Sequence, residues 1–233
     1  MTKIDREALE LAKLAFEADR TKAEARKTEA EALDMEHAAA LKALQLAKAQ
    51  REEDLLAVSD DSNFTYTFDQ GVDEESVGAL LETVTRWDRQ SPESDWHIII
   101  NSPGGYANEG MHLFDTLASY SLRGGGEHHL TMTVRGRAAS MAGILLQVAD
   151  QRVMGPHSML LIHQISGGVW DSVELIKDTV AKWEAQHEQV VDLFVGRSGG
   201  RMTKKKFRRE WNRRDWWIPA DKALSYGFVD GIG

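Results

Sequence analysis

The sequence of 233 residues contains no cysteine and only four prolines. The absence of cysteine excludes a disulfide framework, a thiolate metal site and a cysteine nucleophile. No apolar run approaches the roughly 20 residues that a membrane-spanning helix needs, and the N-terminus lacks the apolar core of a signal peptide. The net charge of −9 argues against nucleic acid as the main partner. We therefore expect a cytoplasmic protein with neither a membrane nor a nucleic-acid partner.

Glycine and proline are both missing from the first part of the chain, where the first of each is Gly71 and Pro92. Alanine, glutamate, lysine and leucine dominate residues 1–57, a composition that favours helix. Large apolar residues are too sparse there for a continuous heptad seam. We expect residues 1–57 to be a helical arm, one long helix or a hairpin, used for docking or oligomerisation. A partly disordered charged arm is the alternative.

Residues 58–233 are expected to form a separate α/β domain, because segments typical of strands and helices alternate along them. Residues 64–68, 96–100 and 130–134 have strand character, and helical spacing follows Asp73 and Asn108. Such alternation predicts parallel βαβ units in layers. The amphipathic segment from Asp171 to about Arg197 is longer than a small sheet can cover. It predicts a helix that projects and packs on a neighbour.

The segment Gly136–Gly143 places one serine, Ser140, among small residues between the strand at 130–134 and an apolar helical run at 144–149. A tight turn with no bulky neighbour exposes a serine hydroxyl, and a helix start places backbone N–H groups beside it. These are the requirements of a nucleophile. A small-residue helix start packed against a sheet is the equally weighted alternative.

Two further segments carry polar chemistry. Gly104 and Gly105 directly follow the strand at 96–100, where a glycine pair lets the backbone approach a ligand closely, although such pairs also occur in ordinary turns. His163 follows an apolar strand, a position that suits either a catalytic residue or a core residue.

The other histidines lack metal-ligand spacing, and we expect His128 and His129 at the surface. The basic cluster at 204–209 favours a solvated or ion-paired helix face over nucleic-acid binding.

Four ordered segments together resemble the ClpP serine peptidases over residues 64–233. They are Asn-Ser-Pro-Gly-Gly at 101–105, Gly-Arg-Ala-Ala-Ser-Met-Ala at 136–142, Ile-His-Gln at 162–164 followed by Gly-Gly at 167–168, and Arg-Asp-Trp-Trp-Ile-Pro-Ala at 214–220. The resemblance implies a layered βαβ superhelical domain of the ClpP and crotonase type. It also implies Ser140 as nucleophile, His163 as general base and Asp215 as orienting acid, with no cofactor and no metal.

The same resemblance assigns the groups around the nucleophile. The N–H groups of Gly105 and Met141 would form the oxyanion hole, which stabilises the tetrahedral intermediate. A peptide substrate would bind as an added strand. The residues implied in substrate binding are Gly104, Tyr106, Ala107, Ile165, Ser166, Gly167 and Gly168.

The family architecture implies a homo-oligomer, a heptameric ring or a double ring. Residues 1–57 stand where the family has loops that meet an ATP-dependent unfoldase, so an unfoldase partner is not expected. Arg213 stands where many members have an acidic residue at the interface between rings. Together, the arm, the shortened loops and the tryptophan-rich core resemble those of the Clp-like proteases of tailed bacteriophages. This resemblance implies cleavage of capsid or scaffold protein in the host cytoplasm or assembling head.

Several alternatives remain open at the level of sequence. One is a host-type ClpP subunit that works with an unfoldase, and another is a crotonase-type acyl-CoA enzyme. A catalytically idle assembly module is a third. A serine–lysine enzyme is disfavoured, because no lysine occurs between Lys48 and Lys177. For the orienting acid, Asp171, Asp221 and Asp230 are the competitors of Asp215.

Overall fold

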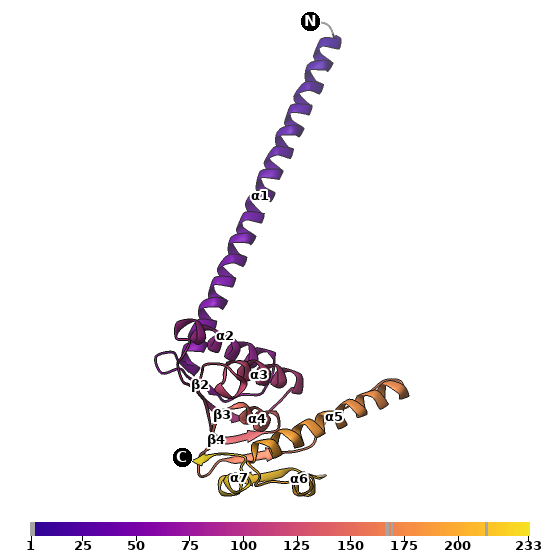
Figure 1. Ribbon diagram of the computed structural model, residues 1–233. Coiled ribbons are helices and arrows are strands. Elements are labelled where there is room, and N and C mark those ends of the chain that lie inside the picture. The colour runs from indigo at the N-terminus through magenta and orange to yellow at the C-terminus, as the bar shows by residue number, and fades with distance from the viewer. Residues whose placement is uncertain (1–2, 166–167, 169, 213) are drawn as a thin grey trace. The chain divides into compact units, whose positions relative to one another are not determined.

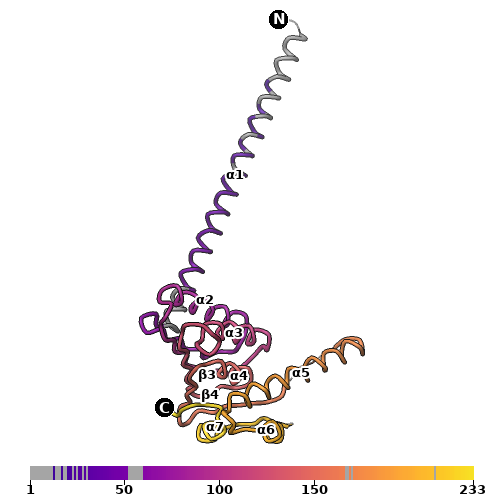
Figure 2. Tube along the Cα trace, in the orientation of Figure 1, coloured from indigo at the N-terminus to yellow at the C-terminus, as the bar shows by residue number. Residues whose placement is uncertain are grey.

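The computed structural model describes residues 3–165, 168, 170–212 and 214–233, and it divides into two units, Met1–Asp54 and Leu55–Gly233. Helix α1 (Lys3–Val58) is continuous, with no hairpin turn (Figures 1 and 2). Its uninterrupted course follows from the absence of glycine and proline. The large apolar side chains between residues 33 and 46 are more than half exposed, so the structure gives them no partner within this stretch of helix.

The second unit is built on one mixed sheet in the order β1-β2-β3-β4-β5-β8, with β6 joining β4 to β7. All pairings are parallel except β1 with β2 and β6 with β7. The strands are β1 (Ser59–Asp60), β2 (Thr65–Phe68), β3 (Trp96–Ser102), β4 (Leu130–Ala139), β5 (Gln151–Met154), β6 (Met159–Ile162), β7 (Trp216–Pro219) and β8 (Gly231–Ile232).

Strand β4 is longer than the sequence suggests. Its first half pairs with β5 and its second half, Arg137–Ala139, pairs with β6. Gly136 lies between the halves with φ 96°, a conformation that glycine adopts readily. The expectation that the strand ends at residue 134 is therefore wrong, because β6 supplies a second set of backbone partners. The tight turn between the strand and the next helix is therefore formed at Ser140 alone, between β4 and Met141.

Helices pack against this sheet in layers, which confirms the predicted α/β class. They are α2 (Glu74–Gln90), α3 (Ala107–Tyr120), α4 (Met141–Leu145), α5 (Val173–Arg197), α6 (Lys204–Trp211) and α7 (Ala220–Tyr226), with short 3₁₀ turns at Leu122–Gly124 and Leu146–Val148. Asp73 is the N-cap of helix α2, and its carboxylate accepts the Ser76 N–H in a capping box. Helices α2 and α3 lie side by side, and α4 packs on α3 (Figure 1).

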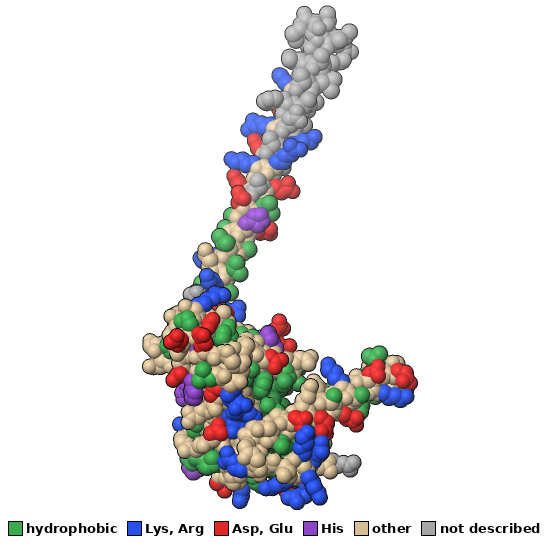
Figure 3. All heavy atoms as spheres, in the orientation of Figure 1, with side chains coloured by type: hydrophobic (Ala, Val, Ile, Leu, Met, Phe, Trp, Pro, Cys, Tyr) green, Lys and Arg blue, Asp and Glu red, His purple; other side chains and the backbone are tan. Residues whose placement is uncertain are grey.

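Helix α5 projects from the body of the unit, as predicted from its length (Figure 1). Val191 and Phe194 are its buried residues, and both lie in its C-terminal half. Helix α6 packs against that half, with ion pairs from Lys204 to Asp192 and from Arg208 to Glu188. Acidic side chains on α5 face basic ones below them (Figure 3). The basic cluster is thus partly paired within its own chain.

An aromatic cluster fixes the C-terminal part of the unit. Phe194 of α5 packs on Phe207 of α6 and on Phe228, with ring centroids 5.6 and 5.1 Å apart. Trp216, the first residue of β7, packs on Phe207 at 5.5 Å. Burying these large rings removes much apolar surface from water, which holds β7 and α6 in place beside β6.

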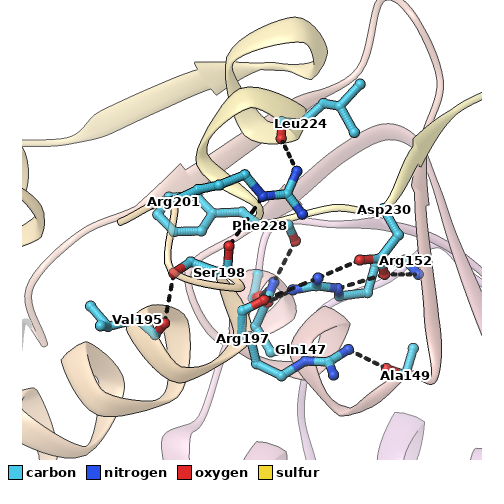
Figure 4. Close-up of polar contacts among 11 residues, drawn as sticks. Gln147, Ala149, Arg152, Val195, Arg197, Ser198, Arg201, Leu224, Phe228 and Asp230 are labelled. Carbon is cyan, nitrogen blue, oxygen red and sulfur yellow. Dashed lines mark hydrogen bonds and ion pairs between the residues drawn. The ribbon is translucent and has the colours of Figure 1, made fainter. Parts of the chain in front are cut away.

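A polar network built on Arg152 holds the end of the chain (Figure 4). The Arg152 guanidinium is buried and donates to both carboxylate oxygens of Asp230, at 2.6 and 2.9 Å. It also donates to the Gln147 Oε1 at 2.7 Å and to the Arg197 carbonyl at 3.3 Å. Because Arg152 is on β5 and Arg197 ends α5, this network ties the C-terminal segment to the sheet and to the long helix.

One sequence expectation about the surface is wrong. His128 is buried, stacked on Trp96 at 3.8 Å, and its ring nitrogens contact the Ser94 carbonyl and the Asp88 carboxylate at 2.8 and 3.1 Å. The glycine-rich loop before it turns the chain back so that the ring enters the core. His129 is half-buried.

Candidate active site

Three strands end at one edge of the sheet. Ala138 of β4 pairs with Ser102 of β3 on one side and with Leu160 of β6 on the other. Since these strands are parallel, their carboxyl ends point the same way, and this is the edge where α/β sheets hold ligands. Gly104, Ser140 and His163 follow the three strand ends.

Ser140 lies in a strained turn. Its φ and ψ are 55° and −123°, a conformation that a residue with a side chain seldom adopts and that costs on the order of 1–3 kcal/mol. The Ser140 N–H donates to the Leu161 carbonyl at 2.9 Å, and the Gly143 N–H donates to the Ser140 carbonyl at 3.0 Å. These bonds at the start of α4 hold the turn. The hydroxyl is half-buried and makes no hydrogen bond to any residue that the structure describes.

Gly104 packs against this turn so closely that no side chain fits. A Cβ at Gly104 would lie 2.5 Å from the Ala139 carbonyl oxygen and 2.7 Å from the Ser140 Cβ, and its φ of 87° also favours glycine. Val72 holds the segment from the other side, donating to the Gly104 carbonyl at 2.9 Å and accepting from the Tyr106 N–H at 2.8 Å. The glycine pair is therefore a close-approach site rather than a free turn.

Two backbone N–H groups at this edge make no hydrogen bond to a described residue. They belong to Gly105, between the two bonds to Val72, and to Met141, the first residue of α4. The Met141 N–H lacks a partner because the first N–H groups of a helix have no acceptor in the helix itself. Both groups are available to stabilise a negative charge.

Ser140, His163, Gly105 and Met141 line one cavity of about 210 Å³. Its remaining lining residues are Tyr106, Ala107, Ile144, Ile162, Ile165, Val190 and Trp211. A neighbouring cavity of about 660 Å³ shares Tyr106, Ala107 and Ile165 with it and extends between α3 and α5. Hydrophobic side chains gather in the hollow between these helices (Figure 3). The space is therefore elongated, with room beyond the serine on one side.

His163 and Asp215 occupy neighbouring positions without a bond between them. His163 is half-buried directly after β6, and Asp215 is exposed directly before β7, which pairs antiparallel with β6. Among the residues that the structure describes, neither ring nitrogen of His163 is hydrogen-bonded to Ser140 or to Asp215. Ser140 and His163 thus line the same cavity, whereas Asp215 does not line it.

The competing acids have other surroundings. Asp230 is held by Arg152; burial works to raise its pKa, but the hydrogen bonds and charge of Arg152 lower it below the ordinary value. Asp171 accepts the N–H of its neighbour Ser172 at 2.6 Å. Asp221 is exposed in the first turn of α7.

The segment after His163 is described in part. Ile165 lines the cavity, and its N–H donates to the Nε2 of His187 on α5 at 2.9 Å. Gly168 is exposed, with no atom near the position of a Cβ. Ser166, Gly167 and Arg213, which the sequence analysis singled out, lie outside the described residues.

Five residues at or beside the cavity were not predicted as site residues from the sequence. One of them, Ile162, directly precedes His163 at the end of β6. Ile144 lies one turn after Ser140 in the helical run, and this spacing could have found it. Val190, Trp211 and His187 come from α5 and α6, and no local signal connects them to Ser140.

Neither a metal centre nor a membrane span is found in the described part of the chain. No cluster of three histidine, aspartate or glutamate side chains there could hold an ion, and no helix there has the length and apolarity to cross a bilayer.

Comparison with known proteins matches residues 59–233 to the Clp protease family. The chain is 28% identical over 165 residues to the ATP-dependent Clp protease proteolytic subunit of Bacteroides fragilis, covering 69% of this chain and 74% of the relative. It is 29% identical over 163 residues to the ATP-dependent Clp protease proteolytic subunit 2 of Cutibacterium acnes, covering 69% and 73%. With three quarters of its length matched, the chain belongs to the Clp protease family.

Proposed function

We propose that this chain is a serine endopeptidase in which Ser140 is the nucleophile, His163 the general base and Asp215 the residue that orients the base. The observation that carries the proposal is the shared cavity: it is lined by Ser140, by His163 and by the two residues, Gly105 and Met141, whose N–H groups are unpartnered among the described residues. Family membership implies a peptidase, and this cavity supports the serine type.

In the proposed reaction the Ser140 hydroxyl attacks the carbonyl carbon of the scissile peptide bond, and His163 takes the hydroxyl proton. The carbonyl oxygen becomes negative and receives hydrogen bonds from the Gly105 and Met141 N–H groups. His163 then gives its proton to the leaving amine, and water releases the acyl group by the same steps. Catalytic hydrogen bonds often form only when substrate is bound. The proposed mechanism is therefore compatible with a His163 ring that is bonded to neither Ser140 nor Asp215 in this structure.

The elongated space favours a peptide over a compact acyl group. The cavity at Ser140 shares Tyr106, Ala107 and Ile165 with the larger cavity between α3 and α5, so the two lie next to each other. A substrate strand could therefore extend several residues beyond the cleaved bond, as β-strand addition requires. A crotonase-type acyl-CoA enzyme would use acidic catalytic groups, and among the residues that the structure describes no aspartate or glutamate lines the cavity at Ser140.

Labelling with a serine-directed fluorophosphonate tests the proposal. We expect mass spectrometry to find the label on Ser140, and we expect His163→Ala to abolish it. His157→Ala is the matched control, because His157 is exposed on the turn before β6, and labelling should continue. Absence of labelling in the full-length chain under every assembly condition would contradict the serine mechanism and would favour an idle assembly module.

We also propose that the chain assembles into a ring or double ring through α5. Trp170 is fully exposed, and Val173, Leu175 and Val180 are 66, 52 and 42% exposed along the projecting half of this helix. Such a series of apolar side chains is covered when copies of the chain associate. Light scattering of the full-length chain should give the mass of an oligomer, and Val173→Asp with Leu175→Asp should lower it. A monomeric wild-type chain would contradict this.

We further propose that the natural substrate is a capsid or scaffold protein cleaved during phage head assembly. The support is helix α1, all of which precedes the family match at residue 59 and which displays exposed apolar side chains. Such an arm could dock on a substrate and make an ATP-dependent unfoldase unnecessary. Processing of a co-expressed capsid or scaffold protein should stop with Ser140→Ala and weaken after deletion of residues 1–54. Unchanged processing by Ser140→Ala would overturn this role, and degradation that requires an unfoldase would favour a host-type subunit.

A further inference from the structure

His187 lies behind the wall of the proposed active site. Its Nε2 accepts the Ile165 N–H at 2.9 Å, and its ring meets the Trp211 ring edge-on, with centroids 5.3 Å apart and planes at 80°. Ile165 and Trp211 both line the cavity at Ser140, whereas His187 lines another cavity of about 650 Å³, which it shares with Trp211. The imidazole therefore touches two parts of the site wall without reaching the substrate space.

The bond to Ile165 sets the path of the chain just after the proposed base. Ile165 is two residues beyond His163, and the residues that follow it are those proposed to pair with substrate. Since the Ile165 N–H is already bound to His187, it is not free to bind a peptide. Holding this one N–H fixes the backbone from which the next residues continue, and it keeps the Ile165 side chain in the cavity.

The contact requires a neutral imidazole. A ring nitrogen accepts a hydrogen bond only when it carries no proton, so Nε2 must be free and Nδ1 must hold the hydrogen. Burial lowers the pKa of His187, while Glu184 and Glu188 on the same helix act to raise it. From α6, Arg208 and Arg209 line the same cavity, and Arg208 is paired with Glu188. The titratable group in the segment 163–165 is His163.

We propose that His187 is a positioning residue, whose neutral imidazole holds Ile165 and braces Trp211 so that the cavity wall beside His163 is in place when a peptide binds. This inference rests on the proposed peptidase function. It gives His187 a role in substrate affinity and none in the chemistry at Ser140. Protonation of His187 would release the Ile165 N–H and loosen this part of the cavity wall.

Three variants test the proposal in the full-length protein. His187→Leu removes the acceptor, and His187→Gln keeps an acceptor oxygen that does not titrate. His157→Leu is the matched control on an exposed turn. For a peptide substrate, we expect His187→Leu to raise KM about five- to tenfold, the usual effect of losing one hydrogen bond, with kcat and fluorophosphonate labelling within about twofold of wild type. His187→Gln should keep KM near the wild-type value.

The pH profile separates positioning from general stability. Lowering the pH below the ordinary histidine range, about 6.5, should raise KM in wild type and in His157→Leu but not in His187→Gln. Labelling of Ser140 measures the nucleophile directly, so its rate at each pH should be the same in wild type and in the three variants. The proposal would be overturned if His187→Leu had the same KM as wild type, or if His187→Leu lost labelling without a change in KM.

Hydrogen exchange at the Ile165 amide provides a readout that needs no activity. We expect the exchange to be at least about fivefold faster in His187→Leu than in wild type, and unchanged in His187→Gln and His157→Leu. If wild type neither labels nor cleaves, the proposed function fails, yet this exchange measurement still decides whether His187 anchors Ile165. Equal exchange in wild type and His187→Leu would refute the anchoring itself.

Discussion

Ile162 on β6 lies directly opposite Trp216 on the antiparallel strand β7. Continuing this register by one residue on each strand puts His163 and Asp215 at facing positions, although they are 52 residues apart in the sequence. The aromatic cluster around Trp216 holds β7 in this register. This register supports the proposal that the Asp215 carboxylate orients the His163 ring.

This relationship predicts the effect of Asp215→Asn. An amide cannot stabilise the imidazolium that forms during the reaction, so we expect kcat to fall about a hundredfold or more with KM little changed. Steady-state kinetics on a peptide substrate would measure both constants. Asp221→Asn, a nearby exposed carboxylate, should leave kcat unaltered. Nearly intact turnover in Asp215→Asn would show that another acid orients His163.

The close approach of Gly104 to Ser140 predicts a specific effect of Gly104→Ala. The added Cβ would meet backbone and side-chain atoms of the Ser140 turn at 2.5–2.9 Å, so the turn must shift. We expect a loss of about 1–3 kcal/mol in the free energy of unfolding and at least a tenfold slower labelling of Ser140. Denaturant unfolding and labelling rates are the measurements.

Gly125→Ala is the matched control for Gly104→Ala. Gly125 has a similar φ of 93°, but no atom lies within 4 Å of its Cβ position. It should show the cost of backbone strain, about 1 kcal/mol, with a normal labelling rate. If both variants label equally fast, the packing of Gly104 on the turn does not control the nucleophile.

The backbone strain at Ser140 predicts that the serine lowers the stability of the fold in exchange for its position in the active site. Glycine tolerates a φ of 55° and a ψ of −123°, whereas alanine does not. Ser140→Gly should therefore unfold at higher denaturant than Ser140→Ala, with a difference of about 1 kcal/mol after the greater flexibility of unfolded glycine is included. Neither variant should be labelled. A less stable Ser140→Gly would mean that the turn carries no strain.

The ion pair between Arg152 and Asp230 predicts a pH-dependent stability. Burial acts to raise the pKa of Asp230, yet the hydrogen bonds and charge of Arg152 lower it on folding. A carboxyl group whose pKa is lowered on folding stabilises the fold when the pH is above the pKa of the unfolded state, near 3.9. This contribution is lost as the pH falls through the pKa of the folded state. We expect Asp230→Asn to cost about 2 kcal/mol at pH 7, with the difference shrinking below about pH 4.

Thermal or urea unfolding of wild type and Asp230→Asn between pH 3 and 8 would measure this dependence. Asp115→Asn, at an exposed position of α3, is the control and should follow wild type at every pH. A constant difference between Asp230→Asn and wild type across this range would contradict the role of the charge.

Local patterns were sufficient to predict the α/β class, the start of α2 at Asp73 and the projection of α5. Each depends on contacts within a few residues or on periodicity: a capping box, alternating strand residues and an apolar helical stripe. The same patterns misplaced the end of β4 and the environment of His128. In both cases the deciding partner, β6 or Trp96, is distant in the sequence.

The sequence by itself determined which groups are available for chemistry: a serine among small residues, a histidine after an apolar strand, a glycine pair, and no cysteine. Only the tertiary structure decided that Ser140 and His163 share a cavity and that Gly104 fits against the serine. It also decided that Trp211 closes the wall and that His187 holds Ile165. The physical reason is that strand pairing and helix packing join residues through long-range contacts, which leave no trace in local periodicity.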